Sequence, residues 1–540
     1  MTNKTFTLHS THRRGTQGTI QREVHPNRMM TVSFFVPTKN EALAKHIESF
    51  AAQIAAGNLF TGRRSLKEFE RQFGADPKDI ASARRELNRF NVKILETRRH
   101  NGEVIVRGRY SEFKKLVPNL KLHHVVLPNG KEHIARAEGA LELATRKDLF
   151  VGVNGFHRVP VAQTNFRIFR PTPLGTPAGI AGDMKLPNLS PSSFNPVTLA
   201  PLFNPSAKHG LGKKIAIISL GGTFLQTDLT KMATRAGAKK APNLTIIKVD
   251  GVKITADPNG ADVENALDFC GAIWGWDAEF RAYCAENSDT GFAHAIAQAI
   301  EDGCDVITIS WGSAEVNWTE SGLAAMGVQF QRAAVAGIPV VAAAGDNDAP
   351  DGVDDGKLHV DFPASHPQVM AITGLFVELA NKAFKVSIWN RGDSGTGGGV
   401  SNVFPAQAFQ AVASPVKGAD DGHEGFNVGF LPFDADPASG IETIVHGRLT
   451  SVGGTSAGGP QFAGYIVGVI EELGFNPGWF APWAYQNMAK IATPVADGDN
   501  AMSGGKGYKA NPNGYSPVGG IGVIDFQKLM KNIPTPKKAA

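Results

Sequence analysis

Ser456 stands within a run of small residues, Gly453 to Gly459, that precedes the apolar stretch Phe462 to Leu473. The apolar stretch has helical spacing, and small neighbours allow a peptide backbone to approach the Ser456 hydroxyl closely. This pattern is typical of a nucleophilic serine on a tight turn that begins a buried helix. Thr and Ser are also favoured helix N-caps, so a capping role for Thr455 and Ser456 is the alternative.

A nucleophilic serine needs a base, and the histidines do not stand where common serine hydrolases have theirs. The run around Ser456 fits the G-x-S-x-G elbow of α/β-hydrolases, but those enzymes need a His after the serine. No His follows His446, and His209 lacks the His-Gly-Thr setting of a subtilisin-like base. Carboxylates and lysines therefore remain as candidates for the base.

Glu264 and Asp268 are the best candidate pair of carboxylates. Their spacing of four residues places both on one face of a helix. Two adjacent carboxylates repel each other when both are ionised, so the pair keeps one proton at mildly acid pH and can act as a linked base and orienting group. A solvated helix face is the alternative interpretation.

Asp346 follows the apolar run Ile338 to Ala344, which has the composition of a buried parallel strand. The carboxyl ends of such strands are where α/β sheets present groups to ligands. Asp346 is therefore a third candidate. An ordinary Asp that opens a loop is the alternative.

Together these segments resemble the sedolisins, the serine-carboxyl peptidases, and among them the kumamolisin-like members. The matching stretches occur in family order at 264–268, 306–312, 344–346, 359–364, 397–401 and 454–457. The resemblance covers about residues 190–530, and the segment before them resembles the pro-domain of pro-kumamolisins.

The resemblance implies a role for each candidate: Ser456 as nucleophile, Glu264 as general base and acid, Asp268 as orienter of Glu264, and Asp346 as oxyanion-hole group. Asp346 can donate a hydrogen bond only while protonated, which implies activity at acid pH. We therefore expect a serine-type endopeptidase made as a self-processing zymogen. A tripeptidyl-peptidase of the same family and an inactive binding or structural homologue are the alternatives.

The resemblance also implies a calcium site near the C-terminus, but its carboxylates are missing. The positions that correspond to it are Pro494, Val495 and Ser516. Calcium prefers several oxygen ligands that include carboxylates, so we expect a degraded site and no bound cofactor. Asp497 and Asp499 could compensate, or could simply belong to a solvated turn.

The chain changes character near residue 190. Patterns within residues 1–162 predict a compact α+β unit, the expected pro-domain, with strands near 30–37, 104–110 and 120–127 and helices near 40–56 and 78–90. Residues 163–205 are rich in Pro, Gly, Asn and Ser and are predicted to be an exposed linker that contains the activation cleavage.

Residues 206–535 form the expected catalytic domain. Strands near 214–220, 244–250, 304–310, 338–345 and 369–377 alternate with helices near 226–237, 261–275, 290–302 and 321–336. Such alternation predicts an α/β fold with a doubly wound parallel sheet, and the resemblance implies that the sheet is subtilisin-like.

Charge divides at the same boundary. Residues 1–190 carry 31 Lys and Arg against 16 Asp and Glu, whereas residues 191–540 carry 24 against 34. The pI of 8.9 does not require nucleic acid as a partner, because the acidic part of the same chain can bind the basic part. We expect polypeptide substrates, the pro-domain as intramolecular inhibitor, a monomeric chain and no nucleic acid.

The remaining expectations concern location and cross-linking. No run of about 18 apolar residues predicts a membrane span, and the polar N-terminus has no legible signal peptide. The family resemblance implies a secreted protein or one in an acidic compartment. Three cysteines, at 270, 284 and 304, make no disulfide framework, although one bridge could form.

Overall fold

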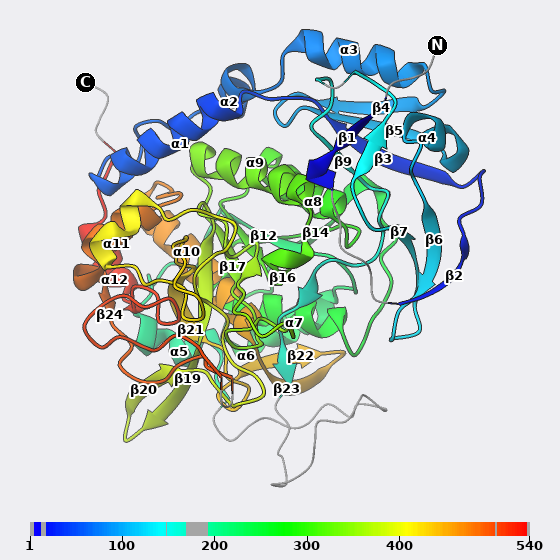
Figure 1. Cartoon of the computed structure of the whole chain (residues 1–540). Coiled ribbons are helices and arrows are strands. Elements are labelled where there is room, and N and C mark those ends of the chain that lie inside the picture. The colour runs from blue at the N-terminus through cyan, green and yellow to red at the C-terminus, as the bar shows by residue number, and fades with distance from the viewer. Residues whose placement is uncertain (1–4, 12–17, 147, 169–192, 503–504, 537–540) are drawn as a thin grey trace.

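The structure is a computed structural model of the whole chain, which describes residues 5–11, 18–146, 148–168, 193–502 and 505–536. An N-terminal part, blue to cyan in Figure 1, lies over helices α8 and α9 of a larger part that contains the main sheet. In the described ranges no helix is long and apolar enough to cross a membrane. Cys270, Cys284 and Cys304 are buried and free.

The main sheet has eight described strands in the order β13-β14-β12-β15-β17-β19-β20, with β21 also paired to β19. All neighbours are parallel except the β19–β20 hairpin. The strands are β12 (Lys214–Ser219), β13 (Asn243–Lys248), β14 (Glu279–Cys284), β15 (Val306–Ile309), β17 (Val340–Ala343), β19 (Met370–Ala380), β20 (Ala383–Ile388) and β21 (Gly429–Asp434). The predicted doubly wound parallel sheet is confirmed.

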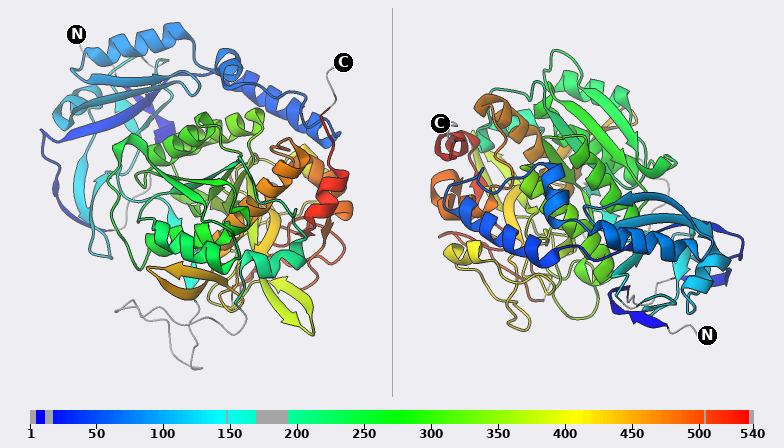
Figure 2. Two further views of the ribbon diagram at one scale, coloured as in Figure 1. Left: turned by 180° about the vertical axis from the view of Figure 1, so that it is seen from behind. Right: turned by 90° about the horizontal axis from the view of Figure 1, so that it is seen from above.

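Helices cover both faces of this sheet, as Figure 2 shows from behind and above. Helices α8 and α9 pack together on one face, and α10 with α7 packs on the other. The helices of this part are α5 (Pro196–Phe203), α6 (Gln226–Arg235), α7 (Ala261–Gly271), α8 (Asp289–Glu301), α9 (Glu320–Ala336), α10 (Gly458–Leu473), α11 (Ala481–Ile491) and α12 (Phe526–Asn532). Helix α10 is buried from Gly458 to Ile470 and is apolar or neutral over that length, whereas α7 is buried throughout and still carries the acidic residues Asp262, Glu264 and Asp268.

The N-terminal part is an α+β unit with its own core. A four-stranded antiparallel sheet has the order β4-β5-β3-β9, and β2, β6 and β7 form a second sheet. The elements are β1 (Phe6–Leu8), β2 (Thr19–Glu23), β3 (Met29–Phe35), α1 (Asn40–Ala55), α2 (Leu66–Phe73), α3 (Pro77–Asn88), β4 (Lys93–Arg98), β5 (Glu103–Arg109), α4 (Tyr110–Leu116), β6 (Leu122–Val126), β7 (Glu132–Arg136), β8 (Leu141–Leu143) and β9 (Gly152–Asn154). Helix α2 packs against α9, and α1 packs against α11.

Residues 163–168 differ from the exposed linker that the sequence predicts. Strand β10 (Gln163–Thr164) pairs with β16 (Trp311–Ala314), and β11 (Arg167–Ile168) pairs with β23 (Arg448–Gly453). Residues 169–192 of the predicted linker lie outside the described residues. Its last residues include the helix α5, which begins with an Asn195 cap and Pro196 in its first turn.

Four short strands complete the described fold. Strand β18 (Asp361–Phe362) pairs with β16, and β22 (Ile441–Val445) forms a hairpin with β23. Strands β24 (Ala492–Thr493) and β25 (Val523–Ile524) pair near the C-terminus. The β22–β23 hairpin leads the chain directly into the turn that carries Ser456.

Candidate active site

Ser456 lies at the junction between β23 and α10, in the short 3-10 turn Thr455–Ala457. Its side chain is fully buried. The Ser456 Oγ is 3.0 Å from Glu264 Oε2 and 3.1 Å from the carbonyl oxygen of Ser310, so the hydroxyl can donate its proton to the carboxylate. No side-chain cap bond was found for α10, so the capping interpretation of Ser456 is wrong.

Glu264 and Asp268 lie on α7, which packs against the Ser456 turn. Both side chains are buried, so the alternative of a solvated helix face is wrong. Burial first, and then the charge of Asp268, raise the pKa of Glu264 well above 4.5, although the hydrogen bond from Ser456 opposes this. Burial likewise raises the pKa of Asp268 well above 3.8.

The hydrogen bonds of this pair leave two oxygens free. Asp268 Oδ1 accepts a bond of 2.6 Å from Ser310 Oγ. Glu264 Oε1 and Asp268 Oδ2 are buried and accept no hydrogen bond from the described residues. A buried carboxylate oxygen without a donor is costly, so the site is better satisfied with at least one of the two carboxyls protonated than with two negative charges.

Asp346 follows β17 and is completely buried. Its Oδ1 accepts hydrogen bonds from the Thr455 backbone N–H at 2.7 Å and from Thr455 Oγ1 at 2.9 Å. Burial raises the pKa of Asp346, whereas the guanidinium of Arg167, 3.6 Å from Oδ2, lowers it. Asp346 Oδ2 accepts no hydrogen bond within the described part of the chain.

The carbonyl of Asn165 points into the space between Ser456 and Asp346. Its oxygen accepts a hydrogen bond of 3.1 Å from the Ser456 N–H. A Cβ on Gly454 would stand 2.2 Å from this oxygen and 2.7 Å from Asp346 Oδ2. Only glycine therefore leaves the position open, and its φ of +108° is also one that side chains disfavour.

Residues 163–168 thus cross the site as an extended chain. On one side of Ser456, Thr164 is in register with Trp311, and on the other Arg167 is in register with Gly453. Both pairings are antiparallel, which is how an extended peptide adds a strand to a sheet edge. The Asn165–Phe166 peptide bond lies between the two pairings, beside the Ser456 turn.

Four further residues complete the site, and sequence reasoning assigned none of them to it. Ser310 bonds Asp268, Thr455 bonds Asp346, Asn165 reaches the Ser456 N–H, and Arg167 faces Asp346. Ser310 and Thr455 belong to stretches that match the sedolisins, which was the available signal. Nothing in the polar, Pro-rich sequence after residue 162 indicates that Asn165 and Arg167 enter the site.

The expected calcium positions do not fit a calcium ion. Ser516 Oγ accepts a hydrogen bond of 2.9 Å from the Gly519 N–H, and the Val495 side chain packs near Gly519. Asp497 and Asp499 hydrogen-bond to backbone groups of their own loop. This loop therefore offers a valine side chain and a hydroxyl where carboxylates are needed.

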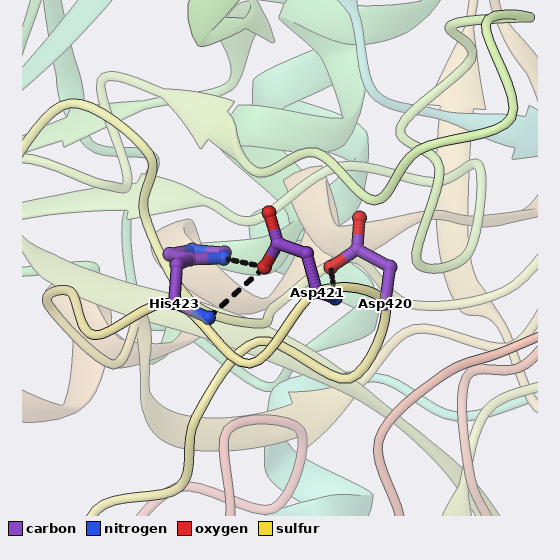
Figure 3. A group of neighbouring side chains, drawn as sticks. All are labelled: Asp420, Asp421 and His423. Carbon is purple, nitrogen blue, oxygen red and sulfur yellow. Dashed lines mark hydrogen bonds and ion pairs between the residues drawn. The ribbon is translucent and has the colours of Figure 1, made fainter.

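One exposed loop holds a group of possible metal ligands within the described residues, Asp420, Asp421 and His423 (Figure 3), whose ligand atoms lie within 4.8 Å of one another. Internal contacts already use these atoms. His423 Nδ1 is 2.6 Å from Asp421 Oδ1, and Asp420 Oδ2 accepts a bond from the Leu358 N–H. The group is remote in sequence from the serine and its carboxylates.

Comparisons with known proteins identify the family of this chain. Residues 284–479 match the model of the subtilase family. The chain is 31% identical to kumamolisin from Bacillus sp. strain MN-32 over 93% of this chain and 91% of that one. It is 26% identical to tripeptidyl-peptidase 1 of Rattus norvegicus over 78% of this chain and 77% of that one.

A solved structure is similar to this chain in fold. Pseudomonas sedolisin, a serine-carboxyl proteinase, superimposes with a TM-score of 0.57 at 25% identity and covers 63% of this chain and 98% of that one. The chain therefore belongs to the sedolisin family and is a serine-carboxyl peptidase with a subtilisin-like fold.

Proposed function

We propose that this chain is an acid-acting endopeptidase, made as a zymogen that cleaves itself at the Asn165–Phe166 bond. Ser456 is the nucleophile, Glu264 the general base and acid, Asp268 its partner, and Asp346 the oxyanion-hole group. The observation that carries the proposal is the Asn165 carbonyl oxygen, which accepts a hydrogen bond from the Ser456 N–H beside Asp346.

The chemistry follows from these contacts. Ser456 Oγ attacks the carbonyl carbon while Glu264 Oε2, 3.0 Å away, takes the hydroxyl proton. The carbonyl oxygen becomes an oxyanion, which the Ser456 N–H and a protonated Asp346 stabilise. Glu264 then gives its proton to the leaving nitrogen as the C–N bond breaks. Water hydrolyses the acyl-enzyme by the reverse use of Glu264 and regenerates Ser456.

The dependence of the proposed activity on acid pH comes from Asp346. A carboxylate only accepts hydrogen bonds, whereas a carboxylic acid can donate one to the oxyanion. Burial favours the protonated form, but Arg167 favours the ionised one in the uncleaved chain. Lowering the pH therefore protonates Asp346 and completes the oxyanion hole for the first cleavage.

The cleft favours an endopeptidase over a tripeptidyl-peptidase. The chain continues beyond the third residue before the Asn165–Phe166 bond, since Asn287 Oδ1 accepts hydrogen bonds of 3.1 Å from both the Val161 and Ala162 N–H groups. Asn287 Nδ2 also donates to the Ala162 carbonyl at 2.7 Å. A tripeptidyl-peptidase needs a cleft that ends after three residues, because it recognises a free amino terminus.

The test is incubation of the full chain at about pH 4, followed by mass spectrometry of both fragments. We expect one fragment to end at Asn165 and the other to begin with Phe166, and we expect Ser456→Ala to remain intact while the exposed-site control Ser49→Ala is cleaved. An N-terminally acetylated peptide that carries residues 161–168 should also be cut. If cleavage depends on Ser456 but occurs only at other bonds, the placement of the Asn165–Phe166 bond at the serine is wrong. A wild-type chain that cleaves nothing would support the alternative that the chain is an inactive homologue.

A further inference from the structure

The Arg167 side chain makes contacts that strand pairing does not require. Its Nη2 donates to Asn347 Oδ1 at 2.7 Å and lies 3.4 Å from the Asp346 carbonyl oxygen. Its Nη1 lies 3.6 Å from Asp346 Oδ2. The pairing of β11 with β23 uses the backbone alone, so these contacts are an additional recognition of the guanidinium.

The register assigns a position to this side chain. With the Asn165 carbonyl oxygen on the Ser456 N–H, Phe166 is the first residue after the reacting bond and Arg167 is the second. The same subsite must therefore receive the second residue after the cleaved bond of any other peptide that binds in this register.

A second buried carboxyl, that of Asp348, lies within range of the charge of Arg167. Asp348 is fully buried, and neither of its carboxylate oxygens has a hydrogen-bond partner among the described residues. Burial, with the charges of Asp393 and Asp499, raises the pKa of Asp348 to about 7, and the charge of Arg167 lowers it. A carboxyl with this pKa is neutral at about pH 4, so Asp348 stabilises a neighbouring cation increasingly as the pH rises and the carboxyl ionises.

We propose that this subsite selects polypeptide substrates with a cationic residue, arginine above all, at the second position after the cleaved bond, and that Asn347 determines this specificity, with Asp348 adding to it as the pH rises. The inference rests on the proposed function. Arginine fits better than lysine because its planar group can reach the Asn347 side chain and the Asp346 carbonyl together.

The subsite also links substrate choice to pH. The charged groups around Asp346 are Arg167 from β11, Glu264 from α7, and the buried carboxyls of Asp351 and Asp361. Among these, only the guanidinium favours ionised Asp346. A substrate with arginine at this position should therefore bind more tightly but need a lower pH for turnover than its neutral counterpart.

The test uses the full chain, held at about pH 4 until its hydrolytic rate is constant, and internally quenched peptides with the sequence of residues 161–168. The peptides carry Arg, Lys, Gln or Glu at the position of Arg167. We expect kcat/KM to be roughly tenfold to a hundredfold higher for Arg than for Gln, mainly through KM, with Lys between them and Glu lowest. On the alkaline side of the pH profile, the rate for the Arg peptide should fall at a lower pH than the rate for the Gln peptide.

Variants separate specificity from catalysis. Asn347→Ala should reduce the ratio of kcat/KM for the Arg peptide to that for the Gln peptide, Asp348→Asn should reduce this ratio less at about pH 4 than at about pH 6, and the exposed-site control Asn513→Ala should leave the ratio intact. Equal rates for the Arg and Gln peptides on the wild-type chain would overturn this inference but leave the peptidase. Failure to cleave any of the peptides would instead overturn the proposed function.

Discussion

His100 is expected to control the release of the N-terminal part in acid. It lies between β4 and β5, is only 5% exposed, and reaches α9 of the catalytic part. Its Nε2 is 3.3 Å from Gln329 Nε2 and 3.4 Å from Arg332 Nη1, so it must be an acceptor and the ring must be neutral there. Burial and the neighbouring Arg332 lower the pKa of His100 to about 3.

The size of the effect follows from linkage. If separation of the two parts exposes His100 and returns its pKa to about 6.5, then between about pH 3 and pH 6.5 the separated form binds a proton on His100 that the docked form does not bind. The contribution to docking is then complete above pH 6.5 and is lost as the pH falls towards 3. Each pH unit changes the docking free energy by about 1.4 kcal/mol, so about 3 kcal/mol disappears between pH 6.5 and pH 4.

The perturbation is His100→Gln, which keeps a polar acceptor but cannot titrate. In a Ser456→Ala background the chain stays whole, and docking is read from hydrogen exchange at interface amides such as Arg64, whose N–H donates to the Val335 carbonyl at 3.0 Å. After correction for intrinsic exchange, acidification to pH 4 should reduce protection roughly a hundredfold more in the His100 parent than in His100→Gln.

The control is His25→Gln, which changes an exposed histidine of the same N-terminal part. On acidification, His25→Gln should lose as much protection as its parent does. If His100→Gln loses protection to the same extent as its parent, His100 does not sense the pH. With Ser456 restored, the cleaved His100→Gln chain should also need a lower pH to release its N-terminal part.

Three further predictions concern charges and a metal. Glu103→Gln should weaken docking by on the order of 3 kcal/mol and permit release of the N-terminal part at higher pH, because the buried His294, whose Nε2 lies 2.8 Å from Glu103 Oε1, loses the negative charge of its partner; hydrogen exchange measures the docking, with the exposed-pair variant Glu23→Gln as control. Glu264→Gln should reduce kcat by about 10⁴-fold or more without changing the melting temperature. A chelator should leave the melting temperature unchanged, and a drop restored by calcium would contradict our interpretation of the loop that contains Ser516.

The net charges of the two parts do not indicate which contacts between them matter most. Opposite net charges predict attraction, but exposed pairs such as Arg158 with Glu286 contribute only about 0 to 1 kcal/mol. The buried contacts of Glu103 and His100 matter more, because desolvation makes their protonation states depend on docking. Neither residue stands out in the sequence, since its burial is created by a surface more than 190 residues away along the chain.

Local sequence predicted the catalytic helix but not everything that surrounds it. The spacing of Glu264 and Asp268 placed both on one helix face, and the apolar run before Asp346 placed it at a strand end, because helix and strand periodicity fix the direction of side chains; that these groups belong to one site was implied only by the resemblance to the sedolisins. Strand β14 (Glu279–Cys284) was not predicted, since charged and polar residues interrupt its pattern. The entry of Asn165 into the site depends on pairing with two distant strands, which no local pattern records.

The two strands on either side of the Asn165–Phe166 bond have a kinetic consequence. In the proposed self-cleavage, a single cut would leave β10 paired with β16 and β11 paired with β23, so both new ends would remain in the cleft and compete with incoming peptides. The first cut is unimolecular, and its rate should not depend on protein concentration. Hydrolysis of an added peptide should begin only after a lag, whose length reports departure of the two ends rather than bond cleavage.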